Sequence, residues 1–525
     1  MSHDPVDVIV IGAGHNGLVA AEQLARAGFS TLVLEQRATV GGAASNALSH
    51  SLPPMHPALT RAITLNGLEW VRPDIPLTAV SASGRAIPFY ADHAKTVEAL
   101  SVSSEVDAER YRRFVGEVRQ AAAVVGAVLE KRAPDIDAPA ITDMLALGGA
   151  ARKFRALDRR TAYGLLRWGP MPIADFVDEW FTDDLLKAAI AARGLLGAML
   201  GPRSAGSTLT YLYQLAFDPH PAGSGLTLTG GVSAFSDALA KAATAAGAKI
   251  LVSAAVRRIV MEDDAVAGVS LESGETIACR AVLSAAGPKR TLLDLIEPGL
   301  IPPDAVRHTQ NIRARGVTAK VNLSLDALPV FPALAAHPSS LRGRIHVGPD
   351  VDYLERAFDA AKYGQASPEP WLEIAVPSTH DATLAPAGKH VMSIYAQYAP
   401  RTLRSGTWKD EGAALLASVM RVLETVSPGI AQIVVHAEVI TPEDLELTYG
   451  MDGGHIHHAE HALDQMLVAR PALGMGGYGS PVRGLYLGSA GAHPGGGITG
   501  LPGLLAAQHV ASELKRTPQK ASALR

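Results

Sequence analysis

The sequence predicts an α/β protein: a parallel sheet built from separated chain segments, joined to an α+β second domain with a helical insertion. Residues 6–11 form an apolar, β-branched run that leads directly into a glycine-rich turn and a helical pattern. A second strand, glycine-rich turn and helical pattern lie near the C-terminus, at residues 484–514. The length of 525 residues allows two or more domains.

Composition excludes several classes of protein. Hydrophobic residues make up 48% of the chain and charged residues 19%, which is typical of a globular protein with a large core. The 47 basic and 51 acidic residues give a net charge of −4, and a chain without excess positive charge is not expected to bind nucleic acid as its main partner. Cys279 is the one cysteine, so an internal disulfide, a CxxC redox pair and a cysteine-rich zinc site are excluded.

Apolar segments predict neither a signal peptide nor a membrane span. The first apolar run, residues 6–11, is too short for a signal peptide. The most apolar longer stretch, Leu185 to Leu200, is interrupted by Lys187 and Arg193. We therefore expect a cytoplasmic protein.

The first glycine-rich turn has the features of a Rossmann-type dinucleotide site. Gly12 permits a tight turn, Gly14 allows a pyrophosphate to approach the backbone, and Gly17 allows the helix to pack closely on the strand. Glu35 ends the next expected strand, where an acidic residue binds ribose. Within this unit, the residues expected to bind the cofactor are Gly12, Gly14, His15, Asn16, Gly17 and Glu35.

Two further glycine-rich segments extend the predicted cofactor site. The pair Gly41 and Gly42 offers another close backbone approach. Near the C-terminus, an expected strand is followed by the segments GSAG and HPGGGITG and then by an expected helix. The positive end of the helix dipole would stabilise the edge of a flavin ring that gains negative charge on reduction. The remaining residues predicted to bind the cofactor are Val256, Gly488, Ser489, Gly496, Gly497 and Ile498.

The rest of the chain predicts alternating strands and helices. Helical spacing is found over residues 107–132, twice within residues 176–200, and over residues 234–246. Strands are expected at residues 249–252, 256–262, 266–271, 276–279 and 281–285, and in a second sheet at residues 317–325 and 371–376. A basic segment, residues 152–167, is interpreted as a solvated helix face; contact with anionic lipid at a membrane periphery is the alternative.

Candidate catalytic residues lie around the C-terminal motif. His493 precedes its glycines and could orient substrate or carry a proton, with a packing role as the alternative. Arg470 suits a substrate carboxylate or phosphate, or else a structural ion pair, and Tyr478 is a candidate cavity residue. The cluster of His455, His457 and His458 lacks acidic or cysteine ligands at suitable spacing, so no metal site is predicted.

Together these blocks resemble the phytoene desaturase-like branch of the flavin amine oxidase superfamily, a carotenoid and retinoid oxidoreductase family. The match covers most of the chain, and the specific segments are GAGHNGL, HPGGGITG, DATLAPAGKH at residues 381–390 and TPEDLE at residues 441–446. Within it, the chain is most similar to the pyridine nucleotide-disulfide oxidoreductase domain-containing protein 2 group. The resemblance implies FAD and oxidation of a C–C, C–N or C–O bond by hydride transfer.

The resemblance also implies a division into domains. We expect residues 1–60, 222–300 and 475–516 to form the FAD-binding domain, residues 61–221 and 301–474 the substrate domain, and residues 517–525 a flexible tail. Relatives usually carry an acidic residue and a Pro-Gly-Phe segment after the paired glycines. This chain has residues 45–65 instead, with Pro53 and Pro54.

The expected activity is a desaturase-like dehydrogenase or oxidase acting on a largely apolar small molecule. Electrons would pass to quinone or oxygen. Two alternatives stay open from the sequence: a flavin-fold binding or regulatory protein without turnover, and an amine oxidase.

Overall fold

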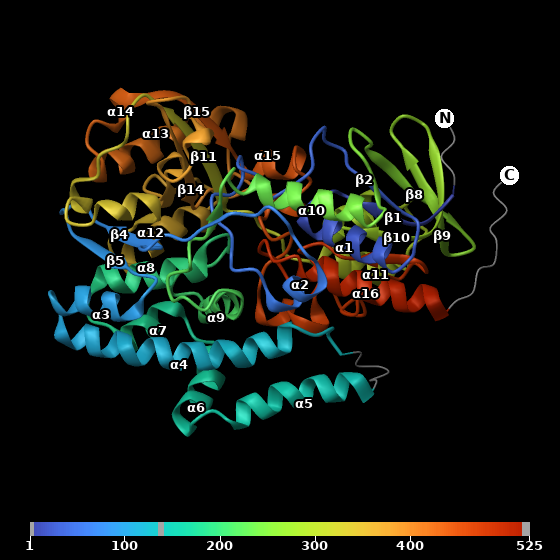
Figure 1. Cartoon of the computed structure of the whole chain (residues 1–525), viewed down its shortest axis with the longest axis horizontal. Helices are drawn as coiled ribbons and strands as arrows, with labels where there is room; N and C mark the ends of the chain where they lie inside the picture. The colour runs from blue at the N-terminus through green and yellow to red at the C-terminus, as the bar shows by residue number, and fades with distance from the viewer. Residues whose placement is uncertain (1–4, 135–140, 517–525) are drawn as a thin grey trace.

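A computed structural model describes residues 5–134 and 141–516 of the chain. Two large sheets lie one after the other along the long axis of the molecule, and α4 (Glu105–Leu129), α5 (Ile141–Arg155) and α6 (Arg159–Trp168) run along one side (Figure 1). The tail predicted at residues 517–525 is outside the described residues.

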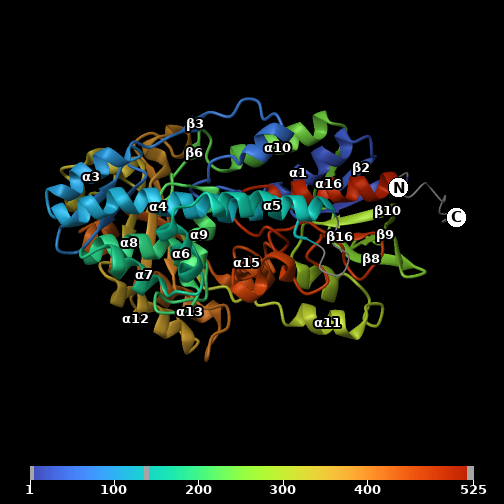
Figure 2. The same cartoon turned by 90° about the horizontal axis from the view of Figure 1, so that it is seen from below.

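The first sheet contains the predicted parallel strands. Its parallel part has the order β7 (Lys249–Leu251), β2 (Thr31–Leu34), β1 (Val6–Ile11), β10 (Thr276–Ser284) and β16 (Leu485–Leu487). The helices α10 (Ser233–Ala245) and α16 (Leu501–Arg516) both pack against α1 (His15–Arg26) (Figure 2). The carboxyl ends of β1 and β16 therefore meet at one edge, where each is followed by a glycine-rich turn. The predicted fold class is confirmed.

One prediction in this region is wrong. Residues 276–279 and 281–285 were expected to form two strands, but they form the single strand β10. Its first half pairs with β9 (Ala265–Leu271), the partner of β8 (Val256–Glu262) in the predicted hairpin. Its second half pairs in parallel with β1 and β16. The strand stays continuous because each half has a different partner.

The second sheet is mixed, and its two faces have different chemistry. Its order is β15 (Val434–Ile440), β11 (Thr318–Leu325), β14 (His390–Gln397), β13 (Trp371–Ala375), β12 (Arg344–Val347), β4 (Leu77–Val80) and β5 (Ala86–Phe89). Alternate residues, such as Val321, Ile374 and Ile394, form an apolar core with α13 (Trp408–Val426). The other face carries polar side chains, including Lys320 and Glu373, that line the cavity described below.

Predicted strands at 317–325 and 371–376 are found as β11 and β13, and the helices predicted within residues 107–132 and 176–200 are found as α4, α7 (Ile173–Trp180) and α8 (Asp184–Leu195). The remaining α-helices and β-strands of the described residues are α2 (Pro57–Ala62), β3 (Trp70–Val71), α3 (His93–Ser101), α9 (Ser207–Phe217), β6 (Thr227–Leu228), α11 (Pro303–Gln310), α12 (Val351–Lys362), α14 (Ile430–Ile433) and α15 (Pro442–Leu447). The exact domain boundaries stay a prediction.

The basic segment lies on α5 and α6, at the surface. Arg160 pairs with Glu117 and Arg167 pairs with Glu179, which neutralises part of its charge. These ion pairs favour the solvated-face interpretation, and lipid contact stays a prediction. Over residues 5–134 and 141–516, no helix is both long and apolar enough to cross a bilayer.

Candidate active site

A cavity of about 310 Å³ joins the first sheet to the polar face of the second. One end lies at the glycine-rich turn after β1. Its lining also includes the C-terminal glycines Gly496 and Gly497 and, on the second sheet, Lys320 and Tyr395, which we call the far end. A ligand could therefore lie at the carboxyl ends of the parallel strands, as is usual for open α/β sheets.

Most of the predicted cofactor-binding residues are brought together along this cavity. Those that line it are Gly12, Gly14, His15, Asn16, Gly17, Glu35, Gly42, Val256, Gly496, Gly497 and Ile498. The other three, Gly41, Gly488 and Ser489, lie behind the lining. Gly41 donates to the carbonyl oxygen of Ala13, Gly488 donates to that of Ser284, and the Ser489 hydroxyl accepts from Gly491 N. These three residues therefore support the turns that face the cavity.

The turn after β1 has the geometry of a phosphate-binding site. Gly12 has a φ of +95°, and a Cβ on Gly17 would lie 1.9 Å from the Gly12 carbonyl oxygen. A Cβ on Gly14, in contrast, would meet no protein atom within 4 Å. Among the described residues, the His15 Nε2 and Asn16 Oδ1 atoms are buried without a hydrogen-bond partner. These unsatisfied polar atoms and the open space beside Gly14 fit a bound dinucleotide.

Glu35 fixes the same turn. Its carboxylate accepts a 2.8 Å hydrogen bond from Ala13 N and a 2.9 Å hydrogen bond from Arg37 N. A carboxylate has about four acceptor positions, so Glu35 keeps capacity for a ribose hydroxyl. The Arg37 guanidinium lies 4.4 Å from the centre of the Tyr449 ring, and both residues line this end of the cavity.

The C-terminal glycines are held by histidines that the sequence did not single out for this role. Gly496 N donates to His461 Nε2 at 3.0 Å, and Gly497 N donates to His457 Nδ1 at 3.1 Å. Burial lowers the pKa of both histidines well below its usual value, so each accepts a hydrogen bond as a neutral imidazole. The Tyr213 hydroxyl donates to the Gly496 carbonyl oxygen at 3.1 Å. The backbone beside the cavity is thus fixed from both sides.

At the far end, polar side chains form a row across three neighbouring strands. Lys320 on β11 lies opposite Tyr395 on β14, and Tyr395 lies opposite Glu373 on β13. Burial lowers the pKa of Lys320 to about 7. Burial alone would raise the pKa of Glu373, but Arg344 and His50 lower it to about 2. This end therefore holds a permanent carboxylate and an amine that can exchange a proton near neutral pH.

The comparison with known proteins identifies the cofactor. Residues 17–370 match the model of the flavin containing amine oxidoreductase family. The chain belongs to this family. Its cofactor is FAD, as the cavity residues predict.

The chain is also similar to curated proteins, and a solved structure shares its fold. The chain is 33% identical to the rat protein "Pyridine nucleotide-disulfide oxidoreductase domain-containing protein 2", covering 97% of this chain and 94% of the relative. It is 26% identical to the phytoene desaturase (lycopene-forming) of Pseudescherichia vulneris, over 94% and 96% of the two chains. An oxidoreductase from Methanosarcina mazei has the same fold, with a TM-score of 0.61, 17% identity and coverage of 96% and 100%.

The three predicted catalytic residues do not line this cavity. His493 is fully buried, and its Nε2–H donates to the Lys131 carbonyl oxygen at 2.7 Å. Tyr478 is also fully buried, within the core of the first sheet. Arg470 is buried as well. Their catalytic roles stay predictions, and their placement favours structural roles.

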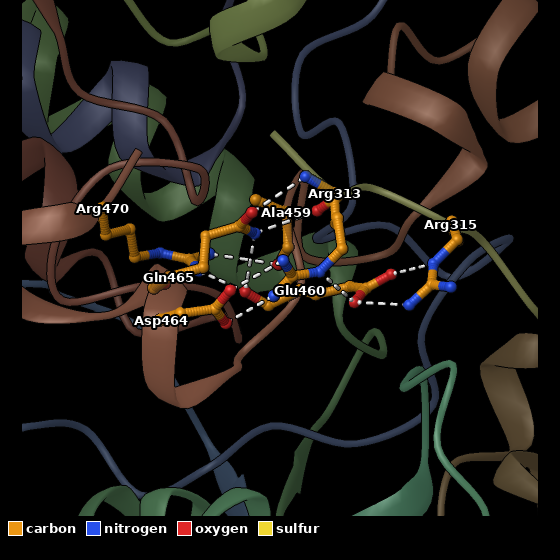
Figure 3. Close-up of polar contacts among 7 residues, drawn as sticks. All are labelled: Arg313, Arg315, Ala459, Glu460, Asp464, Gln465 and Arg470. Carbon is orange, nitrogen blue, oxygen red and sulfur yellow. Dashed lines mark hydrogen bonds and ion pairs between the residues drawn. The ribbon is translucent and has the colours of Figure 1, made fainter. Parts of the chain in front are cut away.

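Arg470 joins the histidine-bearing segment to the C-terminal turn. Figure 3 shows its side chain beside Ala459 and Glu460 of that segment. Its guanidinium donates to the carbonyl oxygens of Ala459, Glu460 and Ala490, the last at 2.8 Å. Burial lowers the pKa of Arg470 to about 10, so it stays charged at neutral pH. Its acceptors are main-chain oxygens, so it supports the loop rather than meeting a substrate anion.

The outer side of the same loop is held by ion pairs. Glu460 accepts hydrogen bonds from Arg315, and Arg313 pairs with both Glu460 and Asp464 (Figure 3). Gln465 donates to the Glu460 carbonyl oxygen at 3.1 Å. This network positions the segment that carries His457 and His461.

Sequence reasoning missed the row on the second sheet. The alternation of Thr318, Lys320 and Asn322 with apolar residues was a usable signal. A lysine within an expected strand is rarely buried unless it is paired, so it indicates a polar face. The predicted absence of a metal stays a prediction. Among the described residues, no group of three His, Cys, Asp or Glu side chains has metal-site geometry.

Proposed function

We propose that the protein is an FAD-dependent dehydrogenase or oxidase that removes hydride from a largely apolar small molecule, with quinone or oxygen as electron acceptor. The observation that carries the proposal is the continuity of one cavity from the glycine turn after β1, past Gly496 and Gly497, to Lys320. A cofactor and a substrate could meet in that cavity.

The chemistry of the lining supports a mixed substrate with an apolar body. Leu52, Leu196, Phe217 and Ile456 contribute apolar surface to the cavity. Lys320 contributes the polar group whose charge can change near neutral pH. An apolar molecule with one position able to lose a proton would match both parts of this lining.

FAD, when bound, supplies the acceptor for a hydride. The neutral Lys320 amine accepts the proton that the substrate loses, so that one hydride and one proton leave the substrate together. The buried position of Lys320, 2% exposed, keeps bulk water from competing for that proton.

Amine oxidation is the second candidate, because the family description includes it. A bound ammonium group would need a free carboxylate at the substrate end. Glu373 is engaged by Arg344, and Asp218 accepts from the amide and the hydroxyl of Ser224. These contacts favour a substrate without a fixed positive charge.

The test is anaerobic flavin reduction with a panel of apolar alcohols, alkenes and amines. Lys320→Met should slow reduction by about 10²-fold to 10⁴-fold, the range for loss of a general base, with flavin occupancy unchanged. Lys389→Met is the matched control, because Lys389 is exposed and pairs with Asp326. Reduction by amines with release of hydrogen peroxide would favour the amine oxidase. A flavin that no substrate reduces, and that quinones and oxygen do not reoxidise after photoreduction, would identify a binding protein.

A further inference from the structure

His50 connects Lys320 to Glu373 through a continuous chain of polar atoms. Lys320 Nζ lies 3.2 Å from His50 Nδ1, and His50 Nε2 lies 3.3 Å from a carboxylate oxygen of Glu373. His50 and Lys320 are buried, and Glu373 is nearly so. The three residues come from separate parts of the chain, so the fold itself brings them together.

The carboxylate determines which nitrogen of His50 carries the hydrogen. Nε2 faces Glu373, so it carries the hydrogen and donates it to the carboxylate. Nδ1 is then an acceptor, directed towards the Lys320 amine and the Ser393 hydroxyl at 3.1 Å. Ser393 also accepts a hydrogen bond from Lys320, which closes the network.

Tyr395 holds the lysine and the histidine in place. The Lys320 ammonium lies 4.4 Å from the centre of the Tyr395 ring, and the ring of His50 lies 4.7 Å from the same ring. The Tyr395 hydroxyl donates to the Leu48 carbonyl oxygen at 2.8 Å, which fixes the segment that carries His50. That segment is the one in which the sequence departs from the pattern usual for the resembled family.

We propose that His50 and Glu373 are positioning residues that set the protonation of Lys320 for the reaction in this cavity. This inference rests on the proposed function, in which Lys320 accepts the substrate proton while the hydride passes to FAD. The proton that reaches Lys320 Nζ is shared with His50 Nδ1, and Glu373 stabilises the positive charge on that pair without itself becoming protonated. Glu373 suits this role because Arg344 keeps its carboxylate ionised.

The charged and titratable groups around Lys320 determine the expected effect. His50 and Tyr395 contact it directly, and Glu373, Arg344 and His346 stand behind them on β13 and β12. Glu373 is the acidic member of this group, and its charge favours the protonated lysine. Removal of the Glu373 charge should therefore lower the pKa of Lys320 further, by about one pH unit, the lower end of the usual effect of one nearby charge.

The experiment measures the protonation of Lys320 directly and needs no substrate. Trace acetylation of the FAD-loaded protein at a series of pH values, with mass spectrometry of the peptide that contains Lys320, gives the pH at which this amine becomes reactive. Glu373→Gln and His50→Phe should both move that midpoint downwards from about 7. His346→Gln is the matched control, because His346 lies opposite Glu373 in the sheet but bonds to the Gly348 carbonyl oxygen instead.

Two results would overturn the proposal: an unchanged midpoint in both folded variants, or an equal shift in His346→Gln. The use of two variants covers the case in which Glu373→Gln fails to fold because Arg344 loses its partner. Where a reducing substrate is found, the pH profile of flavin reduction should move with the acetylation midpoint. A shifted midpoint without any substrate would contradict the proposed function and leave the positioning role intact.

Discussion

Arg470 donates a 2.8 Å hydrogen bond to the carbonyl oxygen of Ala490, three residues beyond the end of β16. The same guanidinium holds the 457–465 loop, so one side chain joins the two segments that face the C-terminal part of the cofactor cavity. The buried guanidinium therefore has a structural role, because main-chain carbonyl oxygens of both segments accept its hydrogen bonds.

Replacement of Arg470 should therefore damage stability and cofactor retention together. In Arg470→Ala several buried carbonyl oxygens lose their donor, at about 1–3 kcal/mol each, so we expect a loss of at least about 3 kcal/mol in the free energy of unfolding. Urea unfolding and flavin occupancy measure the two effects. Arg315→Ala is the control. Its side chain is 56% exposed and pairs with Glu460 from outside, so its effect should stay below about 1 kcal/mol. Equal effects of the two substitutions would contradict the proposal that Arg470 holds the two segments together.

Gly14 offers a clean test of the dinucleotide end. Its φ is −71°, which any residue can adopt, and a Cβ there would meet no protein atom within 4 Å. Gly14→Val should therefore fold as well as the wild type but lose FAD, because the added methyl groups enter the space of the cofactor. Gly412→Ala, at another unobstructed glycine, is the control for folding and FAD content. A fully loaded Gly14→Val protein would exclude this turn from the cofactor site.

At the C-terminal motif, substitution of a glycine affects the protein as well as the cofactor. A Cβ on Gly496 would lie 2.3 Å from His457 Cβ. We expect Gly496→Val to lose FAD and also to lower the melting temperature of the apoprotein, unlike Gly14→Val. Differential scanning calorimetry of both apoproteins separates the two cases, and identical melting temperatures would show that the His457 contact is unimportant.

His493 tests a sequence-based hypothesis against its position in the structure. A general acid or base at this residue predicts that His493→Ala slows flavin reduction by about 10²-fold to 10⁴-fold. Because the side chain bonds to the Lys131 carbonyl oxygen and does not line the cavity, we expect near-normal reduction with reduced stability instead. Burial also lowers the pKa of His493 to about 4, so it is neutral at pH 7. Single-turnover reduction kinetics decide between the two outcomes.

The buried histidines should make the protein sensitive to mild acid. Burial lowers the pKa of His15, His50 and His458 to about 4 and that of His455 to about 3, so between pH 6.5 and 4 the unfolded chain binds protons that the folded protein does not. Each such proton lowers stability by about 1.4 kcal/mol per pH unit as the pH falls. Asp452 has the opposite effect on stability. Burial raises its pKa to about 7, so in this pH range the folded protein binds one proton that the unfolded chain does not. Urea unfolding at pH 7.5, 6.0 and 5.0 should show a steep decline, and constant stability over that range would contradict the burial of these histidines.

The residues predicted to bind the dinucleotide lie together along the cavity because the predicted motif is local. Gly12, Gly14, Gly17 and Glu35 lie within one βαβ unit, so their spacing along the chain determines their arrangement in space. The contact between Lys320 and His50 joins residues 270 apart in the sequence, and that between His50 and Glu373 joins residues 323 apart. No periodicity predicts such contacts, because they depend on the order of strands in the second sheet.

The C-terminal site illustrates a second limit. Gly496, Gly497 and Ile498 of the segment HPGGGITG line the cavity, but the role predicted for its histidine depended on proximity in the sequence alone. In the structure His493 is buried, and its ring donates to the Lys131 carbonyl oxygen instead. The histidines that do contact the glycines, His457 and His461, come from a loop more than 30 residues earlier.

In the second sheet, apolar side chains on one face alternate with cavity-lining polar side chains on the other. This arrangement has a consequence for how the protein can change over evolutionary time. Residues such as Val321, Ile374 and Ile394 keep the sheet bound to α13, while their immediate neighbours Lys320 and Glu373 face the cavity. A mutation at one set therefore leaves the other set in place. A duplicated gene could therefore change its cavity residues and acquire a new substrate without repacking the apolar core, provided that the FAD turns were kept and that Glu373 and its ion-pair partner Arg344 changed together.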